Sequence, residues 1–212
     1  NINSISKKIK IKDVNKKIEN FSIDRKLINF IEWFSMYNMV SRGLVLKMCI
    51  GDGKYFLKND QFKKIKKKEV IKYLLNKEQK KSLEYLENTN DKFSVSVLQG
   101  TTGSGKTIVY FERIKKIINK NKQALVLLPE IFLTNQFQSR FEEFFGFSPP
   151  IWHSKITPKN KRIIWKGVLQ NKIQLIIGAR SSLFLPFKKL GIIIVDEEHD
   201  SSYKQDEGVI YN

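Results

Sequence analysis

The residues with the clearest chemical potential lie at positions 100–107, where the chain reads GTTGSGKT. This string fits the spacing G-x-x-x-x-G-K-[ST] and lies between a predicted strand and a predicted helix, where such a loop wraps phosphates. The glycines allow backbone N–H groups to point inward around an anion, and the start of the following helix adds partial positive charge. Lys106 is expected to reach the β- and γ-phosphates of a nucleoside triphosphate, and the Thr107 hydroxyl to ligate Mg²⁺. The candidate nucleotide-binding residues of this loop are Gly100, Thr101, Thr102, Gly103, Ser104, Gly105, Lys106 and Thr107.

A second group of chemically capable residues follows the apolar run at positions 192–195. A carboxylate at the carboxyl end of a buried parallel strand, next to a phosphate loop, is where Mg²⁺ is held in nucleotide-binding α/β folds. Asp196 is therefore the candidate metal residue, acting through water, and Glu197 is placed to orient and deprotonate an attacking water. A kinase needs no glutamate to activate water, so the adjacent pair favours hydrolysis, with a P-loop small-molecule kinase as the alternative.

Strands and helices alternate along the chain from about residue 78 onward, and these elements must position the two groups. Apolar runs predict strands at residues 93–99, 123–128, 151–153, 173–178 and 191–195. Helices are predicted at residues 106–119, 135–145 and 158–169, with Thr134 and Thr157 as N-caps and Pro158 in the first turn. Because the strands show little alternation, they predict an α/β fold whose parallel sheet is covered by helices on both faces.

The first 75 residues have a different character. Residues 22–38 predict an amphipathic helix, and its aromatic side chains, among them Phe30, Trp33 and Tyr37, are expected in the core rather than on a base-stacking surface. Residues 43–50 predict a short apolar strand, and residues 51–53 a turn. The lysine run at residues 63–68 is typical of a solvated helix face or a linker.

The composition restricts the classes of protein to which the chain can belong. Its 212 residues are 41% apolar and 28% charged, which is enough for a packed core and excludes a disordered tail. The formal net charge is +18, and residues 1–82 hold 21 basic but only 8 acidic residues. This asymmetry predicts a polyanionic partner such as nucleic acid, with a membrane surface or mere compositional bias as alternatives.

The same composition bears on the cellular location. No apolar run is long enough for a membrane helix, and no membrane partner is expected. One cysteine and two histidines exclude an internal disulfide and a Cys/His zinc cluster. We therefore expect a cytoplasmic protein. The chain begins at Asn1 rather than at methionine, which favours a fragment.

Longer strings narrow the assignment by resemblance. The four residues at 196–199, DEEH, resemble the DEAD/DEAH box of superfamily 2 helicases. Similarity to one family of these enzymes, the primosomal replication-restart helicases PriA (primosomal protein N′), is carried by LLPEIFLTNQ (127–136), WHS (152–154), GARSSLFLPF (178–187) and DEEHDSSYKQDEG (196–208). The resemblance covers residues 76–212 almost without a gap. Residues 25–50 look like the end of the family's DNA-binding domain, which captures the 3′ end of a nascent strand at a stalled fork.

The resemblance implies roles for further residues. Gln79, in NKEQ, is expected to read adenine, since an amide offers one donor and one acceptor, and His199 to link the γ-phosphate to DNA occupancy. Residues 129–136 and 178–184 are expected to lie along the DNA backbone, although Arg180 has a local salt bridge as its alternative. The candidate DNA-binding residues are Thr134, Arg180, Ser181, Tyr203 and Lys204, and the candidate catalytic residues are Lys106, Asp196, Glu197 and His199.

For the whole chain, the resemblance implies a RecA-like P-loop NTPase lobe with a parallel sheet and helices on both faces, preceded by a small basic DNA-binding segment. Residues 1–50 would be the C-terminal part of a 3′-end DNA-binding domain, residues 51–75 a basic linker in place of the family's winged-helix domain, and residues 76–212 the first helicase lobe.

The implied activity is that of an ATP-dependent 3′→5′ DNA helicase or translocase that assembles primosomes at stalled forks, with ATP and Mg²⁺ as cofactors. Forked or single-stranded DNA, other primosome proteins and single-strand-binding protein are the implied partners, and the zinc expected for the family has no ligands in this chain. A fragment without the second lobe and its arginine finger is expected to bind ATP but to be nearly inactive. A non-catalytic, ATP-gated DNA-binding module is the remaining alternative.

Overall fold

The centre of the molecule is a four-stranded parallel sheet, seen in a computed structural model that describes residues 23–51, 62, 70, 73–88, 93–133 and 135–204. The strands are β1 (Gln123–Leu127), β2 (Ile151–Trp152), β3 (Leu175–Gly178) and β4 (Leu190–Val195), in the order β2-β3-β1-β4. Every pairing is parallel, and β1 lies between β3 and β4 with Val126 opposite both Ile177 and Ile194. The predicted parallel sheet is confirmed, with slightly shorter strands at β1, β2 and β3.

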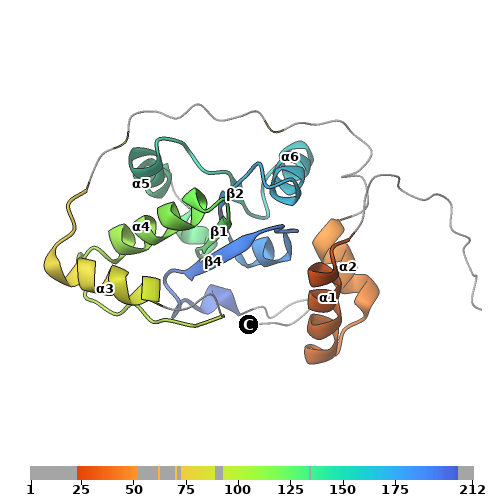
Figure 1. The fold of residues 1–212 in the computed structure, drawn as a ribbon. Coiled ribbons are helices and arrows are strands. Elements are labelled where there is room, and N and C mark those ends of the chain that lie inside the picture. The colour runs from red at the N-terminus through yellow and green to blue at the C-terminus, as the bar shows by residue number, and fades with distance from the viewer. Residues whose placement is uncertain are drawn as a thin grey trace, which may run out of the picture.

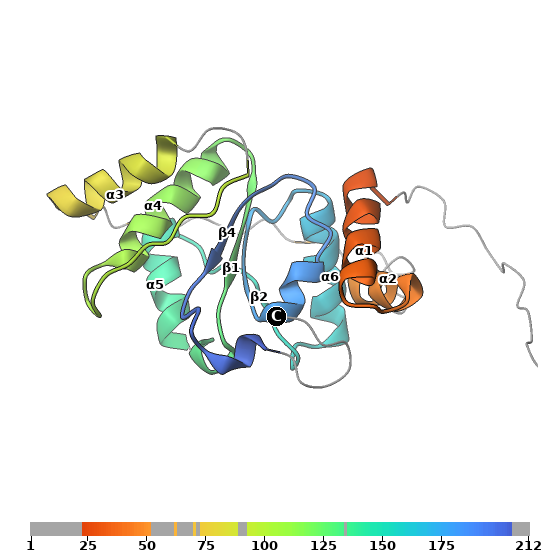
Figure 2. The same cartoon turned by 90° about the horizontal axis from the view of Figure 1, so that it is seen from below.

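One face of the sheet is covered by α4 (Lys106–Asn119) and α5 (Asn135–Phe145) (Figure 2). Ala124 and Val126 of β1 point into this layer, which is rich in phenylalanine. The rings of Phe111 and Phe141 lie 4.4 Å apart between centroids, and those of Phe111 and Phe144 lie 5.0 Å apart. Such aromatic packing fixes α4, the helix that follows the phosphate loop, against the central strand.

The opposite face is covered by α6 (Pro158–Leu169) (Figure 2). Leu125 and Leu127, the alternate residues of β1, pack there with Ile164, Trp165 and Val168 of the helix. Because both sets of alternate side chains are buried, β1 is apolar throughout, as expected for a central parallel strand. The predicted α/β fold with helices on both faces is confirmed.

The bounds of α4, α5 and α6 agree with those predicted from the sequence. The start of α6 is fixed by Thr157, whose hydroxyl accepts a hydrogen bond from the Asn160 N–H at 3.3 Å, and by Pro158 in the first turn. The predicted cap of α5, Thr134, lies outside the described residues.

Two short helices, α1 (Arg25–Tyr37) and α2 (Arg42–Ile50), pack together at the α6 side of the sheet (Figures 1 and 2). The strand predicted at residues 43–50 is therefore wrong. Ser41 caps α2 by accepting a hydrogen bond from the Leu44 N–H, and Gly51 ends it with a φ of 66°. Val45 and Cys49, one helical turn apart, are both buried against α1, so the apolar run has a helical period.

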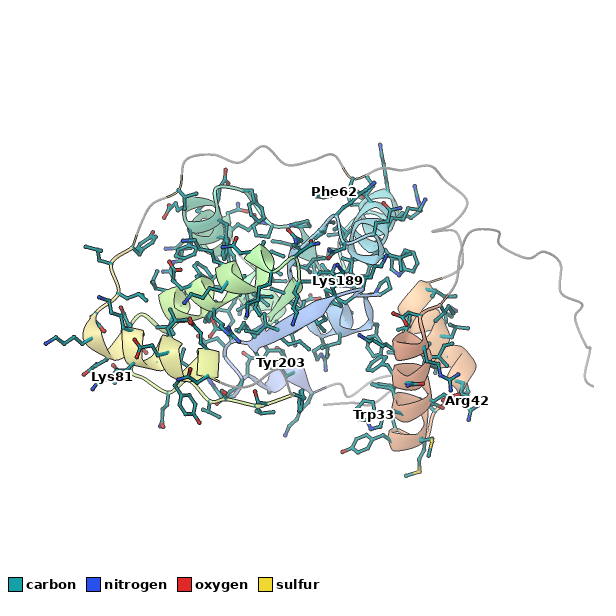
Figure 3. The ribbon with its side chains drawn as sticks, in the orientation of Figure 1. Trp33, Arg42, Phe62, Lys81, Lys189 and Tyr203 are labelled. Carbon is teal, nitrogen blue, oxygen red and sulfur yellow. The ribbon has the colours of Figure 1, made fainter. Side chains whose placement is uncertain are left out.

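The aromatic side chains of α1 are only partly in the core. Phe34 is buried against Phe184, as predicted. Trp33 and Tyr37 are 56% and 74% exposed and stack on each other with ring centroids 5.5 Å apart, so their predicted burial is wrong (Figure 3). They lie one turn apart on α1, and both rings are mostly open to solvent.

The strand predicted at residues 93–99 is also wrong, since the structure gives this segment no regular secondary structure. Phe93, Val95 and Val97 are 95%, 80% and 87% exposed. An apolar pattern produces a strand only when another strand supplies hydrogen-bond partners, and among the described residues none pairs with this segment. The segment runs beside α3 (Lys77–Asn88), which packs on α4 (Figure 1).

Strand β4 is the edge of the described sheet, and this changes its predicted burial. Ile192 and Ile194 pack against the α4 side, whereas Ile193 and Val195 are exposed. The prediction of a wholly buried strand is thus wrong for one of its faces, because α6 covers β1 and β3 but not β4.

Several predictions concern residues outside those described. They include the basic segment 1–22, most of the 51–75 linker with its lysine run, and residues 205–212. None of the helices formed by the described residues has the length and apolar character needed to span a bilayer.

Candidate functional site

The phosphate loop joins residues 93–99 to α4, and two of its glycines have left-handed backbones. Gly103 has a φ of 82° and Gly105, the N-cap of α4, a φ of 81°. Such torsions are costly for residues with a Cβ, which explains glycine at both positions. The Ser104 N–H donates to the Thr101 carbonyl at 3.2 Å, which closes the turn before α4. The predicted loop, placed directly before a helix, is thus present.

The Lys106 side chain folds back over this loop. Its Nζ donates hydrogen bonds to the main-chain oxygens of Gly100, at 2.6 Å, and of Thr101, at 3.2 Å. An ammonium has three donors, so these two bonds leave one, and a phosphate oxygen would take it or replace a carbonyl. The lysine is thereby held at the mouth of the loop without an acidic partner among the described residues.

Gln79 lies against the same loop, and both polar atoms of its side-chain amide make hydrogen bonds. Its Oε1 accepts from the Asn76 N–H at 3.0 Å, while the Asn76 side chain accepts from the Gln79 N–H at 2.8 Å. This reciprocal pair is a capping box at the start of α3. The Gln79 Nε2 donates to the Ser104 carbonyl at 3.0 Å, which ties α3 to the phosphate loop. A Cβ on Gly105 would collide with that Nε2.

Asp196 continues from the end of β4, and the structure brings it to α4. Its main-chain N–H still pairs with Leu127 at 3.1 Å, so the sheet pairing fixes its backbone. Its Oδ2 accepts a hydrogen bond of 2.8 Å from the phenol of Tyr110, which lies on α4 one turn beyond Thr107. This contact places the carboxylate beside the first turn of the phosphate-loop helix.

The Tyr110 phenol is almost completely buried, and its surroundings favour the neutral form. Burial raises its pKa well above the usual value near 10, and the negative Asp196 carboxylate raises it further. The nearby side chain of Thr107, three residues earlier on the same face of α4, acts on this pKa in the opposite direction. Tyr110 therefore bonds to Asp196 and shares a helix face with Thr107, the two residues that the sequence assigns to the metal.

Glu197 and His199 form a tight turn after Asp196. The backbone of Glu197 is left-handed, with a φ of 52°, and its N–H donates to Asp196 Oδ1 at 3.1 Å. A positive φ in a glutamate is uncommon and is found at functional sites that need an unusual side-chain direction. His199 lies 3.7 Å from a carboxylate oxygen of Glu197 and 3.7 Å from one of Glu198, with all three side chains open to solvent.

The loop that follows, η4 (Ser201–Tyr203), is anchored to the acidic turn. Asp200 accepts from the Ser202 N–H at 2.7 Å, and its hydrogen bonds with Ser202 hold the pKa of this carboxyl below its usual value. The Tyr203 hydroxyl donates to the main-chain oxygen of Asp196 at 2.6 Å, and its ring packs against the hydrophobic cluster on the α6 side of the sheet. Partial burial, followed by the negative charge of Asp196, raises the Tyr203 pKa. Lys204 is exposed.

The predicted DNA-contacting segments begin where β1 and β3 end. The short helix η2 (Glu130–Phe132) follows β1, and η3 (Arg180–Phe184) follows β3. Because the carboxyl ends of parallel strands lie at the same end of a sheet, both segments lie at the end of the sheet that carries Asp196. Ser181 is exposed and Arg180 is half-buried, whereas Thr134 lies outside the described residues.

A divalent metal ion beside the phosphate loop would need ligands from a bound nucleotide in addition to those from the protein. Among the described residues there is no group of three or more His, Cys, Asp or Glu side chains that could bind a metal by themselves. Mg²⁺ commonly takes one or two protein ligands and completes its shell with water and phosphate oxygens. Asp196, held by the Tyr110 phenol, and Thr107, three residues before Tyr110 on α4, fit that kind of site.

Comparison with known proteins gives the family. Residues 72–211, about two thirds of the chain, match the family described as type III restriction enzyme, res subunit. This span includes the phosphate loop, the acidic turn and the whole sheet. The chain belongs to this family.

Curated relatives of this chain are named replication restart protein PriA. A replication restart protein PriA from Rickettsia conorii is 44% identical over 214 residues, which is 99% of this chain and 32% of that protein. The Bacillus subtilis protein of the same name is 47% identical over 111 residues, or 52% of this chain and 14% of the relative. The chain spans about a third of the length of the Rickettsia relative. The resemblance to PriA noted in the sequence is confirmed, as is a RecA-like lobe as the fold class.

The structure brings several of the predicted site residues together. Gln79 is hydrogen-bonded to the phosphate loop, and Asp196 is hydrogen-bonded to α4, the helix on which Thr107 lies. Tyr203 is hydrogen-bonded to the Asp196 backbone, whereas Ser181 of η3 and Lys204 after η4 are exposed.

Sequence reasoning missed Tyr110 as a residue of the site. Its position, three residues after Thr107 on a predicted helix, places both side chains on the same face, and this spacing was the available signal. A tyrosine in an otherwise apolar stretch needs a partner for its hydroxyl once buried, and the partner can be known only when the end of β4 is placed in space.

Proposed function

We propose that this chain is the first RecA-like lobe of an ATP-dependent DNA helicase or translocase of replication restart, moving 3′→5′ along DNA. The observation that carries the proposal is the hydrogen bond from α4 to Asp196, which sets the acidic turn beside the phosphate loop. The similarity to proteins named replication restart protein PriA supports the assignment to this class of motor.

In this proposal the loop residues bind the triphosphate. Backbone N–H groups at the start of α4 and the Lys106 ammonium bind the β- and γ-phosphates. Thr107 and Asp196 hold Mg²⁺, which neutralises phosphate charge during transfer to water. Glu197, whose backbone is left-handed, orients and deprotonates the attacking water.

Gln79 is proposed to read adenine, and this requires an exchange of partners. Its amide now bonds to Asn76 and Ser104, so binding the base would release at least one of these contacts. Replacing Gln79 would then change both base preference and the support of the loop. Preference for ATP over GTP in the Gln79→Ala variant, measured by competition binding, tests the adenine role; an unchanged preference removes it.

DNA is proposed to bind along the edge of the sheet that carries η2 and η3. Ser181 and Arg180, with Thr134, would donate to phosphates, and Lys204 would meet the backbone from η4. His199 lies close to Glu197 in the acidic turn. We propose that it couples the nucleotide site to DNA binding. Tyr203 would reach a base only by giving up its bond to Asp196.

The remaining expectations extend the proposal beyond the chain. We propose a cytoplasmic protein with other primosome proteins and single-strand-binding protein as partners, in line with the relatives' name. The chain by itself is proposed to bind ATP with slow turnover, since charge stabilisation from a second lobe contributes a factor of about 10³ or more in comparable enzymes.

Equilibrium binding of a fluorescent, non-hydrolysable ATP analogue tests the proposal. Lys106→Ala should weaken binding by about 10- to 100-fold, because charge-assisted hydrogen bonds contribute about 1.5–3 kcal/mol. Lys120→Ala, at the other end of α4, is the matched control and should bind normally. Equal affinities in all three proteins would refute the phosphate-loop assignment, and ATP turnover stimulated by a small acceptor but not by DNA would favour a kinase.

A further inference from the structure

Tyr110 is the one buried hydroxyl, among the described residues, that joins α4 to the acidic end of β4. Its ring belongs to the aromatic layer on the α4 side of the sheet and is 5% exposed. A phenylalanine at this position would fill the same space in that layer and keep the edge-on contact with Phe111. The hydroxyl is therefore unnecessary for packing, and its place is determined by the polar group that it meets.

That polar group is a carboxylate whose position is fixed from several sides. Asp196 Oδ2 accepts from the Tyr110 phenol at 2.8 Å, and Oδ1 accepts from the Glu197 N–H at 3.1 Å. The main chain of Asp196 is held by Leu127 and by the Tyr203 hydroxyl. Backbone pairing fixes where Asp196 lies, but only the bonds to Oδ1 and Oδ2 fix the rotation of the carboxylate.

The phenol also lies near the second residue assigned to the metal. Thr107 precedes Tyr110 by three positions on α4, so the two side chains share one face of the helix. The bond from Tyr110 to Asp196 therefore holds the carboxylate at the face of α4 that carries Thr107. Each carboxylate oxygen has two lone-pair directions, so these bonds leave acceptor capacity for a metal or its water.

We propose that Tyr110 is a positioning residue for the nucleotide-bound metal, which sets the orientation of Asp196 relative to Thr107. This inference rests on the proposed function, since it requires a metal–nucleotide complex at the phosphate loop. Hydrogen-bond partners behind metal ligands are known to be worth about 10- to 100-fold in metal affinity or activity. Without the hydroxyl, the carboxylate keeps its charge and place but gains rotational freedom.

The test uses Tyr110→Phe, with Tyr73→Phe as the matched control. Tyr73 is half-buried and stacks on Phe144 in the same aromatic layer, but its ring lies away from Asp196. Binding of a fluorescent ATP analogue is measured against Mn²⁺ concentration, and Mn²⁺ binding in the presence of analogue is followed by electron paramagnetic resonance. Circular dichroism and urea denaturation check that each variant is folded.

Tyr110→Phe should raise the Mn²⁺ concentration for half-saturation by about 10-fold or more. Nucleotide affinity in EDTA should stay within twofold of wild type, and excess Mn²⁺ should restore tight binding. Tyr73→Phe should match wild type in all three measurements. In an Asp196→Asn background, Tyr110→Phe should add no further loss of metal binding, because the group that it orients no longer carries the charge.

Each other outcome has a definite meaning. If wild type shows no metal-dependent nucleotide binding, the proposed function itself fails. If wild type binds and Tyr110→Phe has the same Mn²⁺ dependence, the function stands and the role of Tyr110 is overturned. If Tyr110→Phe weakens binding equally with Mn²⁺ and with EDTA, the residue serves only the fold, which also overturns the proposal.

Discussion

Two glycines of the phosphate loop give a sharp test of how the loop is supported. Gly103 and Gly105 have almost the same left-handed backbone, with φ of 82° and 81°. A Cβ at Gly103 would meet no heavy atom within 4 Å, whereas one at Gly105 would collide with Nε2 of Gln79. Alanine at the two positions therefore has a similar backbone cost but differs in one contact.

The magnitudes follow from these contacts. A left-handed backbone costs a residue with a Cβ about 1–2 kcal/mol, so Gly103→Ala should lower the free energy of unfolding by that amount. Gly105→Ala must also displace the Gln79 amide from the Ser104 carbonyl, and one such hydrogen bond contributes about 0.5–1.5 kcal/mol. Disturbance of the capping bond to Asn76 adds about 1 kcal/mol, for a total of about 2.5–4.5 kcal/mol.

Urea denaturation of a double-mutant cycle measures the difference. In a Gln79→Ala background the collision is absent, so Gly105→Ala should cost no more than Gly103→Ala. The pair Gly105→Ala and Gln79→Ala should therefore be non-additive by about 1.5–2.5 kcal/mol, while Gly103→Ala and Gln79→Ala should be closer to additive. Equal costs for the two glycine variants in wild type, together with additivity in both cycles, would refute the conclusion that Gln79 supports the loop.

Two further predictions concern stability. Gln123 is fully buried, and its amide hydrogen-bonds two main-chain carbonyls and one main-chain N–H. Gln123→Ala should therefore lower the free energy of unfolding, measured by urea denaturation, by about 3 kcal/mol or more. In the same assay the control Gln136→Ala, at an exposed position, should change it by less than about 0.5 kcal/mol. The pKa values of Tyr110 and Tyr203 are raised in the fold, so their contribution to stability is complete below pH about 10 and falls as the pH rises above it. Thermal melts between pH 8 and 11 should show this loss, and a Tyr110→Phe variant that loses as much stability as wild type over that range would contradict the assignment.

The parts of the fold predicted best from the sequence are those with strong local signals. Helices α4, α5 and α6 have the predicted bounds, because a glycine-rich loop, a threonine cap followed by proline, and sustained helical periods mark them. The central strand β1 was also predicted, since an apolar run that ends at Pro129 matches a strand buried on both faces.

Two segments were predicted wrongly because a short apolar run does not by itself determine whether it forms a helix or a strand, or which strand it pairs with. Residues 43–50 suit a strand by composition, but the cap at Ser41 and the stop at Gly51 fit a helix, and the i, i+4 pair Val45 and Cys49 decides it. Residues 93–99 have a strand pattern, but among the described residues no strand pairs with them. Pairing is a tertiary property that periodicity does not contain.

The candidate site was likewise predicted only in part from the sequence. Residue types and spacing were enough to predict the loop and the acidic turn, because each lies within a few positions of the chain. The contact between Tyr110 and Asp196 joins residues 86 positions apart, so it depends on the order of the strands. The second use of Gln79, in the capping box, was visible in Asn76-x-x-Gln79 and competes with its assignment to adenine.

The most direct measurement is a crystal structure of this chain with a non-hydrolysable ATP analogue and Mg²⁺. The account predicts phosphate density within the loop of residues 100–107 and a metal peak between the Thr107 hydroxyl and the Asp196 carboxylate. Electron density for the nucleotide elsewhere on the molecule, or a fully soaked crystal with an unchanged loop, would contradict it.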